Sequence, residues 1–281
     1  AGAHGDSRLC PIVERASAQA FSETELVTTE PITVVLSAKG WVRAAKGHEV
    51  NPEDMAFKPG DEYQDFAQGK SNQSAVFFDT TGRAYTTNTH TLPSARGLGE
   101  PLSSRLSPPD GAHFLSVTIL ESISFLIMSS SQGYGFVVDV NKVATKNRAG
   151  KAIMTVAEQG SLLKPLLIDN IDEQWVACVT NIGNLLIFPV AELPILSKGK
   201  GQKLIKIPGK KFQTNEEYLA GIAILSGQDS LSVNYSNGKT RILKPTEQEP
   251  YVGDRALRGK KLGKKRGYNT ISSLSTLRGK R

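Results

Sequence analysis

The chain has 281 residues, of which 39% are hydrophobic and 22% charged, with a formal net charge of +7. This length and apolar content allow one large domain or two small ones, and they exclude a chain disordered throughout. No run of about 18 apolar residues occurs, so no membrane span is predicted. The N-terminal AGAHGDSRLC also lacks the apolar core of a signal peptide.

The residue types that build catalytic and metal sites are sparse. The two cysteines, Cys10 and Cys178, belong to no CxxC pair, and the four histidines show no HxxxH or HExxH spacing. No G-x-S-x-G, G-x-G-x-x-G or complete G-x-x-x-x-G-K-[ST] motif is present. We therefore expect no metal, no cofactor and no catalytic centre. Free thiols fit a reducing cytosol, and we expect a cytoplasmic protein.

The first segment with a clear pattern is Pro11–Leu26, which begins with proline and carries helix-forming residues. We interpret residues 1–26 as a linker with a short helical lead-in. Such a segment is typical of the connection to an upstream domain.

A single pattern then recurs five times: an apolar strand, a polar turn with glycine, a second apolar stretch, and a basic residue beside glycine. The turn glycines Gly40, Gly82, Gly133, Gly183 and Gly238 are separated by 42, 51, 50 and 55 residues. Glycine and asparagine suit the left-handed positions of tight hairpins, so each copy predicts a hairpin. A period of about 40–50 residues in an all-strand pattern predicts blade-like repeats.

The basic–glycine elements are the sharpest candidates for function. Arg96-Gly97, Arg148 to Lys151, Lys198 to Lys200 and Arg258 to Lys260 lie 14–20 residues beyond a turn glycine. Arginine and lysine bind phosphates, and glycine lets a backbone N–H approach them closely. One such element alone is more typical of a solvated turn. Four at equivalent positions in a radial array predict a positive belt along one edge. The candidate phosphate contacts are Arg43, Lys46, Arg83, Arg96, Arg148, Lys151, Lys198, Lys200, Arg241, Arg258 and Lys260.

Charge is distributed unevenly. Residues 198–281 contain 19 basic and 6 acidic side chains, a net charge of +13, which leaves −6 for the first 197 residues. This asymmetry favours a polyanionic partner, nucleic acid above all. Residues 263–281 lack apolar periodicity, so we expect a mobile basic tail, which either binds DNA or only aids solubility.

Five motifs together resemble the C-terminal domain of the ParC subunit of bacterial topoisomerase IV, which is related to the C-terminal domain of the corresponding gyrase subunit. They are GWVRAAKGHE (Gly40–Glu49), GKSNQ (Gly69–Gln73), LPSARGLGEPL (Leu92–Leu102), NRAGKA (Asn147–Ala152) and LSKGKGQK (Leu196–Lys203). The resemblance runs from about Pro11 to Leu262.

The resemblance implies an all-β, five-bladed β-pinwheel over residues 27–262, with four-stranded blades that exchange strands. It also implies a non-catalytic domain whose outer rim binds and bends duplex DNA, selecting the segment transported in decatenation and supercoil relaxation. DNA cleavage then belongs to an upstream domain of the same polypeptide, with a tyrosine after an arginine. No Arg-Tyr dipeptide occurs here. ATP hydrolysis belongs to the second subunit of topoisomerase IV, and the holoenzyme is expected at the nucleoid.

One departure concerns the gyrase Gln-Arg-Arg-Gly-Gly-Lys-Gly box, where this chain has Arg43-Ala44-Ala45-Lys46-Gly47. The two alanines favour topoisomerase IV and argue against gyrase-like wrapping. Two alternatives remain: a propeller-like scaffold that binds an acidic protein, and an enzyme on a propeller fold. The first predicts weak DNA binding, and the second needs convergent catalytic groups that the sequence does not show.

Overall fold

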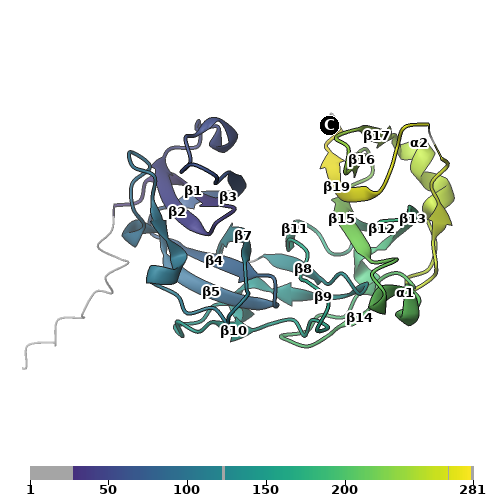
Figure 1. Cartoon of the computed structure of the whole chain (residues 1–281), viewed down its shortest axis with the longest axis horizontal. Helices are drawn as coiled ribbons and strands as arrows, with labels where there is room; N and C mark the ends of the chain where they lie inside the picture. The colour runs from purple at the N-terminus through teal and green to yellow at the C-terminus, as the bar shows by residue number, and fades with distance from the viewer. Residues whose placement is uncertain (1–27, 122–123, 265, 280–281) are drawn as a thin grey trace, which may run out of the picture.

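The computed structural model describes residues 28–121, 124–264 and 266–279. These residues form five antiparallel sheets (Figure 1). Sheet 1 has the order β3 (Tyr63–Lys70), β1 (Pro31–Ser37), β2 (Trp41–Lys46), β6 (Glu100–Pro101). Sheet 2 has the order β7 (Phe114–Ile119), β4 (Ser74–Asp79), β5 (Arg83–Asn88), β10 (Lys151–Ala152). Sheet 3 has the order β11 (Leu166–Ile168), β8 (Phe125–Ser129), β9 (Tyr134–Asp139), β14 (Gln202–Lys203).

Sheet 4 has the order β15 (Leu219–Leu225), β12 (Trp175–Thr180), β13 (Asn184–Pro189), β18 (Lys260–Lys261). Sheet 5 has three strands, β19 (Ile271–Leu277), β16 (Ser230–Tyr235) and β17 (Thr240–Leu243). The helices are short: α1 (Gly209–Gln213), α2 (Pro245–Gln248), and the 3-10 turns η2 (Pro52–Asp54), η3 (Thr89–Thr91), η4 (Leu102–Ser104), η5 (Val140–Lys142), η6 (Val190–Glu192) and η7 (Glu249–Tyr251). The expected all-β class is confirmed, except that the fifth sheet has three strands among the described residues.

The sheets exchange strands in a regular way. In each of sheets 1–4, the fourth strand comes from chain that follows the hairpin of the next sheet: β6 follows β5, β10 follows β9, β14 follows β13, and β18 follows β17. This is the exchange expected of a pinwheel. The strands β3, β7, β11, β15 and β19 lie on the inner side of the arc, and the exchanged strands lie on its outer side (Figure 1).

Each exchanged strand is part of a Gly-X-X-aliphatic segment. The glycines Gly99, Gly150, Gly201 and Gly259 all have positive φ, between 73° and 87°. The aliphatic residues are Leu102, Ile153, Leu204 and Leu262, all buried. Each donates its backbone N–H to the carbonyl of the turn glycine of the sheet it closes, at 2.8–3.0 Å. The glycines therefore serve strand exchange, because a Cβ on Gly201 would lie 2.2 Å from the Gly135 carbonyl oxygen.

Gly201→Ala should consequently lower the free energy of unfolding by about 2 kcal/mol or more, since the left-handed backbone alone costs roughly 1–2 kcal/mol. Gly97→Ala is the matched control. Gly97 lies in the equivalent connector, a Cβ there meets nothing within 4 Å, and its φ is not in the left-handed region. Urea denaturation of both variants measures the difference. Equal midpoints would show that the close approach at Gly201 is not required.

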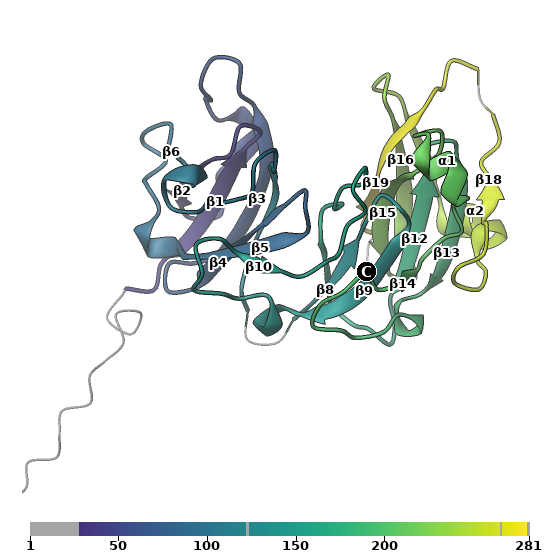
Figure 2. The same ribbon diagram turned by 60° about the horizontal axis from the view of Figure 1, so that its bottom comes forward.

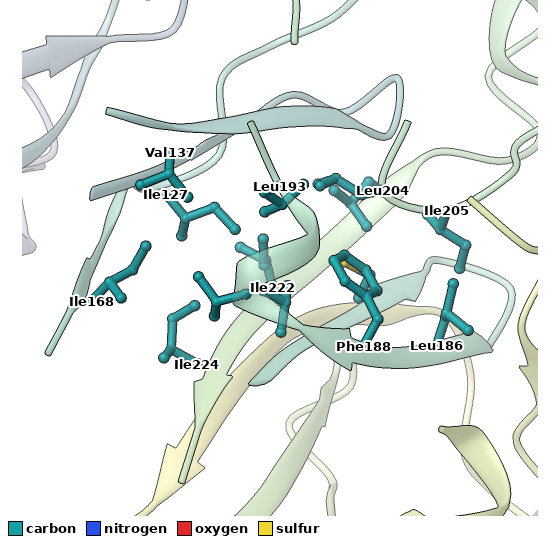
Figure 3. Close-up of a cluster of buried hydrophobic side chains, with 14 residues drawn as sticks. Ile127, Val137, Ile168, Leu186, Phe188, Leu193, Leu204, Ile205, Ile222 and Ile224 are labelled. Atoms are coloured by element: carbon teal, nitrogen blue, oxygen red, sulfur yellow. The ribbon is translucent and has the colours of Figure 1, made fainter. Parts of the chain in front are cut away.

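Hydrophobic packing joins consecutive sheets. Four buried clusters lie between sheets 1 and 2, 2 and 3, 3 and 4, and 4 and 5. In the cluster between sheets 3 and 4, Ile127 lies near Ile222, and at the other end Ile205 lies above Leu186 (Figure 3). The middle sheets bury both faces, which explains why their strands read as continuous apolar runs.

The arc stays open, and its two ends carry different caps (Figures 1 and 2). Sheet 4 presents Val179 and Leu185 to sheet 5, four residues before and two after its turn glycine. At the same spacing sheet 5 has Asn234 and Thr240, and the Asn234 amide donates to Ser273. A polar outer face is typical of a terminal repeat.

At the other end, residues Phe57 and Lys58 cover the free face of sheet 1. The Arg43 guanidinium lies 5.0 Å from the Phe57 ring centroid, and Lys58 Nζ lies 3.5 Å from the Trp41 ring centroid. Within the described residues, no hydrophobic cluster joins sheet 5 to sheet 1. The outer face of sheet 5 is therefore polar, and the outer face of sheet 1 is covered by its own loop. Over the part of the chain that the structure describes, neither terminal sheet exposes an apolar face on which another sheet could pack.

The expected mobile tail at residues 263–281 is wrong for Ile271–Leu277. This segment is β19, which pairs along β16 and completes the inner side of sheet 5. A β-bulge at Asn234/Tyr235 shifts the register, so Ile271 and Leu274 are both buried despite their spacing of three. That spacing hid the strand, because alternation of period two was the expected signal.

The helix expected within Pro11–Leu26 lies outside the described residues. In the part of the chain that is described, no helix has the length and hydropathy required to cross a bilayer.

Candidate nucleic-acid interface

The outermost layer of sheets 1–4 consists of four chain segments, residues 94–107, 145–155, 195–206 and 252–261, here called the outer belt. Three of them run parallel to the second hairpin strand before they close the sheet, through bridges such as Ala44↔Ser94 and Val137↔Ile195. All four predicted basic–glycine elements lie in this layer. Each element follows the hairpin of one sheet in the chain but pairs with the preceding sheet, because the strands are exchanged.

Backbone hydrogen bonds connect the four segments end to end. Ser107 N donates to the Arg148 carbonyl at 2.8 Å, and Thr155 N to the Gly199 carbonyl at 3.0 Å. Lys206 N donates to the Leu257 carbonyl at 2.9 Å. The outer belt is therefore a continuous backbone layer across sheets 1–4, and side chains on successive segments share one edge of the molecule.

Five of the predicted contacts are exposed on this belt: Arg96, Lys151, Lys198, Lys200 and Lys260. Arg96, Lys198 and Lys260 have no side-chain partner among the described residues. Lys151 Nζ donates to the Lys142 carbonyl at 2.6 Å, and Lys200 Nζ lies 4.1 Å from the Tyr134 ring centroid. These weakly held ammonium groups remain available to an anion.

Two further predicted residues hold the belt in place. Arg83 donates through Nε and Nη2 to the carbonyls of Ala149 and Gly150, at 3.0 and 3.1 Å. Arg148 donates through Nε to the Arg105 carbonyl at 2.6 Å and through Nη2 to the Ser104 carbonyl at 3.2 Å. Their guanidinium groups are used in part to fix backbone, so they add charge to the edge with little freedom to move.

Arg43 requires a correction. It is only 4% exposed, and its guanidinium donates to the carbonyls of Gly97 and Ala56 while it stacks on Phe57. Burial lowers the pKa of its guanidinium. Arg43 therefore anchors the connector of sheet 1 and is not accessible to a phosphate, so we remove it from the candidate contacts.

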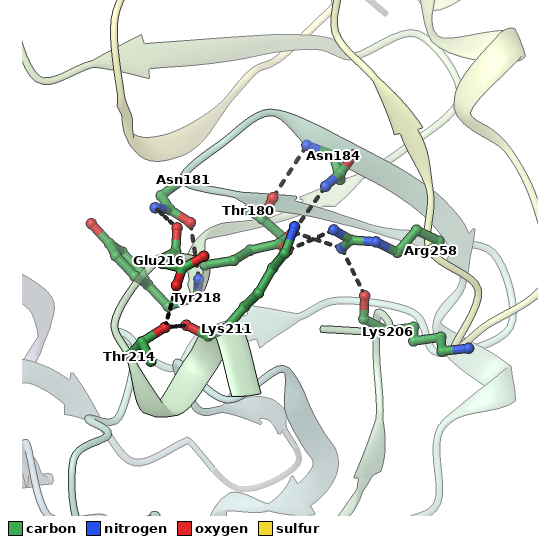
Figure 4. A network of polar contacts seen from close by, with 10 residues as sticks. Thr180, Asn181, Asn184, Lys206, Lys211, Thr214, Glu216, Tyr218 and Arg258 are labelled. Atoms are coloured by element: carbon green, nitrogen blue, oxygen red, sulfur yellow. Dashed lines mark hydrogen bonds and ion pairs between the residues drawn. The ribbon is translucent and has the colours of Figure 1, made fainter. Parts of the chain in front are cut away.

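Arg258 forms a two-pronged ion pair with a buried carboxylate. Its Nη1 and Nη2 each donate to one oxygen of Glu217, both at 2.6 Å, and Nη1 also donates to the Lys206 carbonyl at 2.9 Å. Glu217 is fully buried and accepts a third hydrogen bond from the Asn184 amide at 2.8 Å. Figure 4 shows Arg258 pointing towards the Asn184 turn. Through Glu217 and Asn184, this contact connects the segment before β18 to the segment before β15 and to the start of β13.

Lys46 and Arg241 lie away from the belt. Lys46 ends β2 and lies 3.5 Å from a Glu30 carboxylate oxygen. Arg241 lies on β17, and its Nη1 donates to the Gly263 carbonyl at 3.0 Å. Sheet 5 has no exchanged strand among the described residues, so Arg241 does not extend the row of belt cations.

Four exposed lysines of the belt were missed: Lys146, Lys203, Lys206 and Lys261. Lys203 and Lys261 lie on the exchanged strands β14 and β18, which form the outer edge itself. The repeated Gly-X-X-aliphatic segment could have identified them, since its two middle residues are Lys-Ala, Gln-Lys and Lys-Lys in sheets 2–4. In sheet 1 they are Glu-Pro, and Glu100 pairs with Arg105. The positive charge of the exchanged strands therefore begins at sheet 2 and is greatest at sheet 4.

No group of three or more His, Cys, Asp or Glu side chains placed to hold a metal occurs in the described ranges. Cys178 is fully buried, and burial raises the pKa of its thiol.

Comparison with known proteins agrees with this architecture. The family model for the DNA gyrase C-terminal domain, beta-propeller, matches residues 124–169 and 174–226. The ParC subunit of DNA topoisomerase 4 from Pseudomonas aeruginosa is 46% identical over 271 residues, which cover 96% of this chain and 36% of that protein. The same subunit of Escherichia coli K12 is 42% identical over 92% of this chain and 34% of that protein. The chain thus spans about a third of these relatives.

Among solved structures, the E. coli ParC C-terminal domain has a TM-score of 0.77 and 39% identity, covering 88% of this chain and 98% of that one. The C-terminal domain of DNA topoisomerase IV in a second structure has a TM-score of 0.73 and 17% identity, covering 90% of this chain and 79% of that one, and it supports the fold alone. The exchanged strands, the outer belt and these likenesses together show that the chain belongs to the family of C-terminal domains of the ParC subunit of DNA topoisomerase 4.

Proposed function

We propose that this chain is a non-catalytic domain that binds and bends duplex DNA along its outer belt. The observation that supports this most is the continuous belt with exposed lysines on successive segments. Lys151, Lys203 and Lys260 lie on three exchanged strands of one convex edge. Cations spaced along such an edge neutralise backbone phosphates, and a duplex that follows the edge must bend.

Such binding should carry little sequence specificity. Lysine side chains on two-residue edge strands can reach phosphates, but they offer no helix or ribbon to insert into a groove. Phosphate contacts position the duplex and carry no direct base information. The domain would therefore recognise duplex shape and curvature, which suits a domain that presents DNA to an enzyme acting on its topology.

In the full polypeptide, we propose that this domain selects the DNA segment transported in decatenation and supercoil relaxation. The cleavage reaction would belong to the upstream domain with its tyrosine, and ATP hydrolysis to the second subunit of topoisomerase IV. The topoisomerase 4 relatives support this placement, because the chain matches about a third of their length. We place the protein in the cytoplasm, at the nucleoid.

The test is a matched pair of charge reversals. Lys203→Glu with Lys260→Glu changes two belt residues, and Lys39→Glu with Lys70→Glu changes two exposed lysines off the belt by the same charge. We expect the belt variant to weaken duplex binding by roughly 10- to 100-fold and to reduce the slope of log K against log salt by about 1.8. The control variant should change the slope little. Fluorescence anisotropy with a labelled duplex measures both.

Equal losses in the two variants would show that only net charge matters and would contradict a belt-specific site. Unchanged duplex binding by the belt variant would instead favour the acidic-protein scaffold.

A further inference from the structure

A buried carboxylate joins three sheets on the inner side of the arc. Asp65 lies on β3 of sheet 1 and is 1% exposed. It accepts hydrogen bonds from Ser116 Oγ at 3.1 Å and Val117 N at 3.0 Å, both on β7 of sheet 2. Its second contact comes from further along the arc, where Lys164 Nζ lies 2.5 Å from Oδ1. Lys164 stands two residues before β11 of sheet 3, so one ion pair links sheets 1 and 3 across sheet 2.

The other contacts between the inner strands of neighbouring sheets differ from seam to seam. Between β3 and β7, Gln64 donates to the Leu115 carbonyl at 3.3 Å, and a Cβ on Gly69 would lie 2.7 Å from the Ile119 side chain. Between β15 and β19, Thr276 donates to the Ile224 carbonyl at 2.8 Å. These two seams are tightly closed at the inner side.

The seam between sheets 2 and 3 differs. Among the described residues no hydrogen bond connects β7 to β11, and β11 has only three residues. A cavity of about 460 Å³ opens here, lined by residues that include Phe66, Ile119, Lys164 and Leu167. Leu167 is 53% exposed, so the inner side of this seam is loosely packed.

The outer side of the same seam is tied by backbone. Met154 and Gly199 form a parallel bridge, with Thr155 N donating to the Gly199 carbonyl at 3.0 Å and Gly199 N to the Ile153 carbonyl at 2.9 Å. A seam tied at its outer edge and open at its inner edge can pivot about the outer belt. Leu162 N donates to the Thr80 carbonyl of sheet 2 at 2.9 Å, and the Lys164–Asp65 pair is the side-chain contact that spans the open edge.

We propose that Lys164 and Asp65 form a clasp that sets the angle between sheets 1–2 and sheets 3–5, and thereby the curvature of the outer belt. Asp65 keeps two neutral donors from sheet 2 when Lys164 is lost, so sheets 1 and 2 stay together while sheet 3 loses its side-chain link to them. The consequence for DNA rests on the function proposed above: a clasp that fixes belt curvature also fixes the bend of a duplex lying on it. Lys164 and Asp65 act as positioning residues and contact no DNA.

The test measures the arc without DNA. Spin labels at Ser103→Cys, next to sheet 1, and Gln213→Cys, at the end of α1, report the distance across the seam, with Cys10→Ser in the same chain. Lys164→Met removes the charge and keeps the aliphatic stem, and Lys164→Arg restores a cation. Lys70→Met, an exposed lysine at the end of β3, is the control.

Pulsed electron–electron double resonance measures the distance between the two labels. We expect the distance distribution of Lys164→Met to be at least about twofold broader than that of the parent. The distributions of Lys164→Arg and Lys70→Met should be as narrow as that of the parent. Should Lys164→Met not fold, Lys164→Gln takes its place. An unchanged distribution in the folded variant would overturn the clasp. On a duplex labelled for energy transfer, the broadened variant should show a wider spread of bend angles with an unchanged salt slope. A parent that binds no DNA would refute the proposed function and leave the distance measurement to decide the clasp.

Discussion

Arg258→Met should cost about 3–5 kcal/mol of unfolding free energy, the usual result of leaving a buried charge without its partner. Glu217 is fully buried and receives both of its shortest hydrogen bonds from Arg258. Methionine preserves much of the side-chain volume but donates nothing. Urea denaturation at neutral pH measures the loss, and Arg96→Met, on the equivalent connector but without a side-chain partner among the described residues, should stay within about 0.5 kcal/mol of the parent.

The pKa of Glu217 determines how the stability difference between the parent and Arg258→Met changes with pH. Burial raises the pKa of Glu217, but hydrogen bonds from Arg258 and Asn184 outweigh it and hold the pKa below the ordinary 4.5. The stabilisation is therefore complete above pH 4.5 and is lost as the pH falls through the lower folded value. In Arg258→Met the burial remains without its main donor, so the carboxyl should protonate more readily. The stability gap between parent and variant should narrow in acid, and a gap that widens would contradict the assignment.

The second large effect concerns salt. If the outer belt contacts about six to ten phosphates, affinity for duplex DNA should fall about 10³- to 10⁵-fold between roughly 50 and 200 mM salt. The reason is counterion release, which scales with the number of neutralised phosphates. Anisotropy titrations of one duplex at several salt concentrations give the slope. An affinity for duplex DNA that hardly changes with salt concentration would exclude a belt that binds phosphates, whatever the affinity at low salt.

Much of the fold could be predicted from local sequence. A turn glycine flanked by short apolar runs is a local signal, and all five hairpins form where Gly40, Gly82, Gly133, Gly183 and Gly238 predict them. The exchange of strands is not a local signal. A two-residue strand such as Lys151–Ala152 carries too little pattern to be recognised, although the glycine before it and the buried aliphatic residue after it repeat in four sheets.

The candidate site was predictable as a region but less so residue by residue. Basic residues beside glycine indicate the belt. Charge alone does not distinguish an exposed cation without a partner from one that forms a structural ion pair. Arg96 and Arg258 occupy similar motifs, and only the second has a buried carboxylate beside it, because Glu217 is brought there from 41 residues away. Arg43 reads as a cation in the sequence, but the cover from Phe57 buries it. Such pairings depend on tertiary contacts that spacing does not encode.

Lysine footprinting tests the central claim most directly. The chain is treated with an amine-reactive reagent, free and bound to a short duplex, and protection of each lysine is measured by mass spectrometry. The belt predicts protection of Lys151, Lys203, Lys260 and Lys261, with Lys39, Lys70 and Lys164 reacting equally in both states. Protection centred on those inner and turn lysines, with the belt lysines still reactive, would contradict an outer edge that carries the double helix.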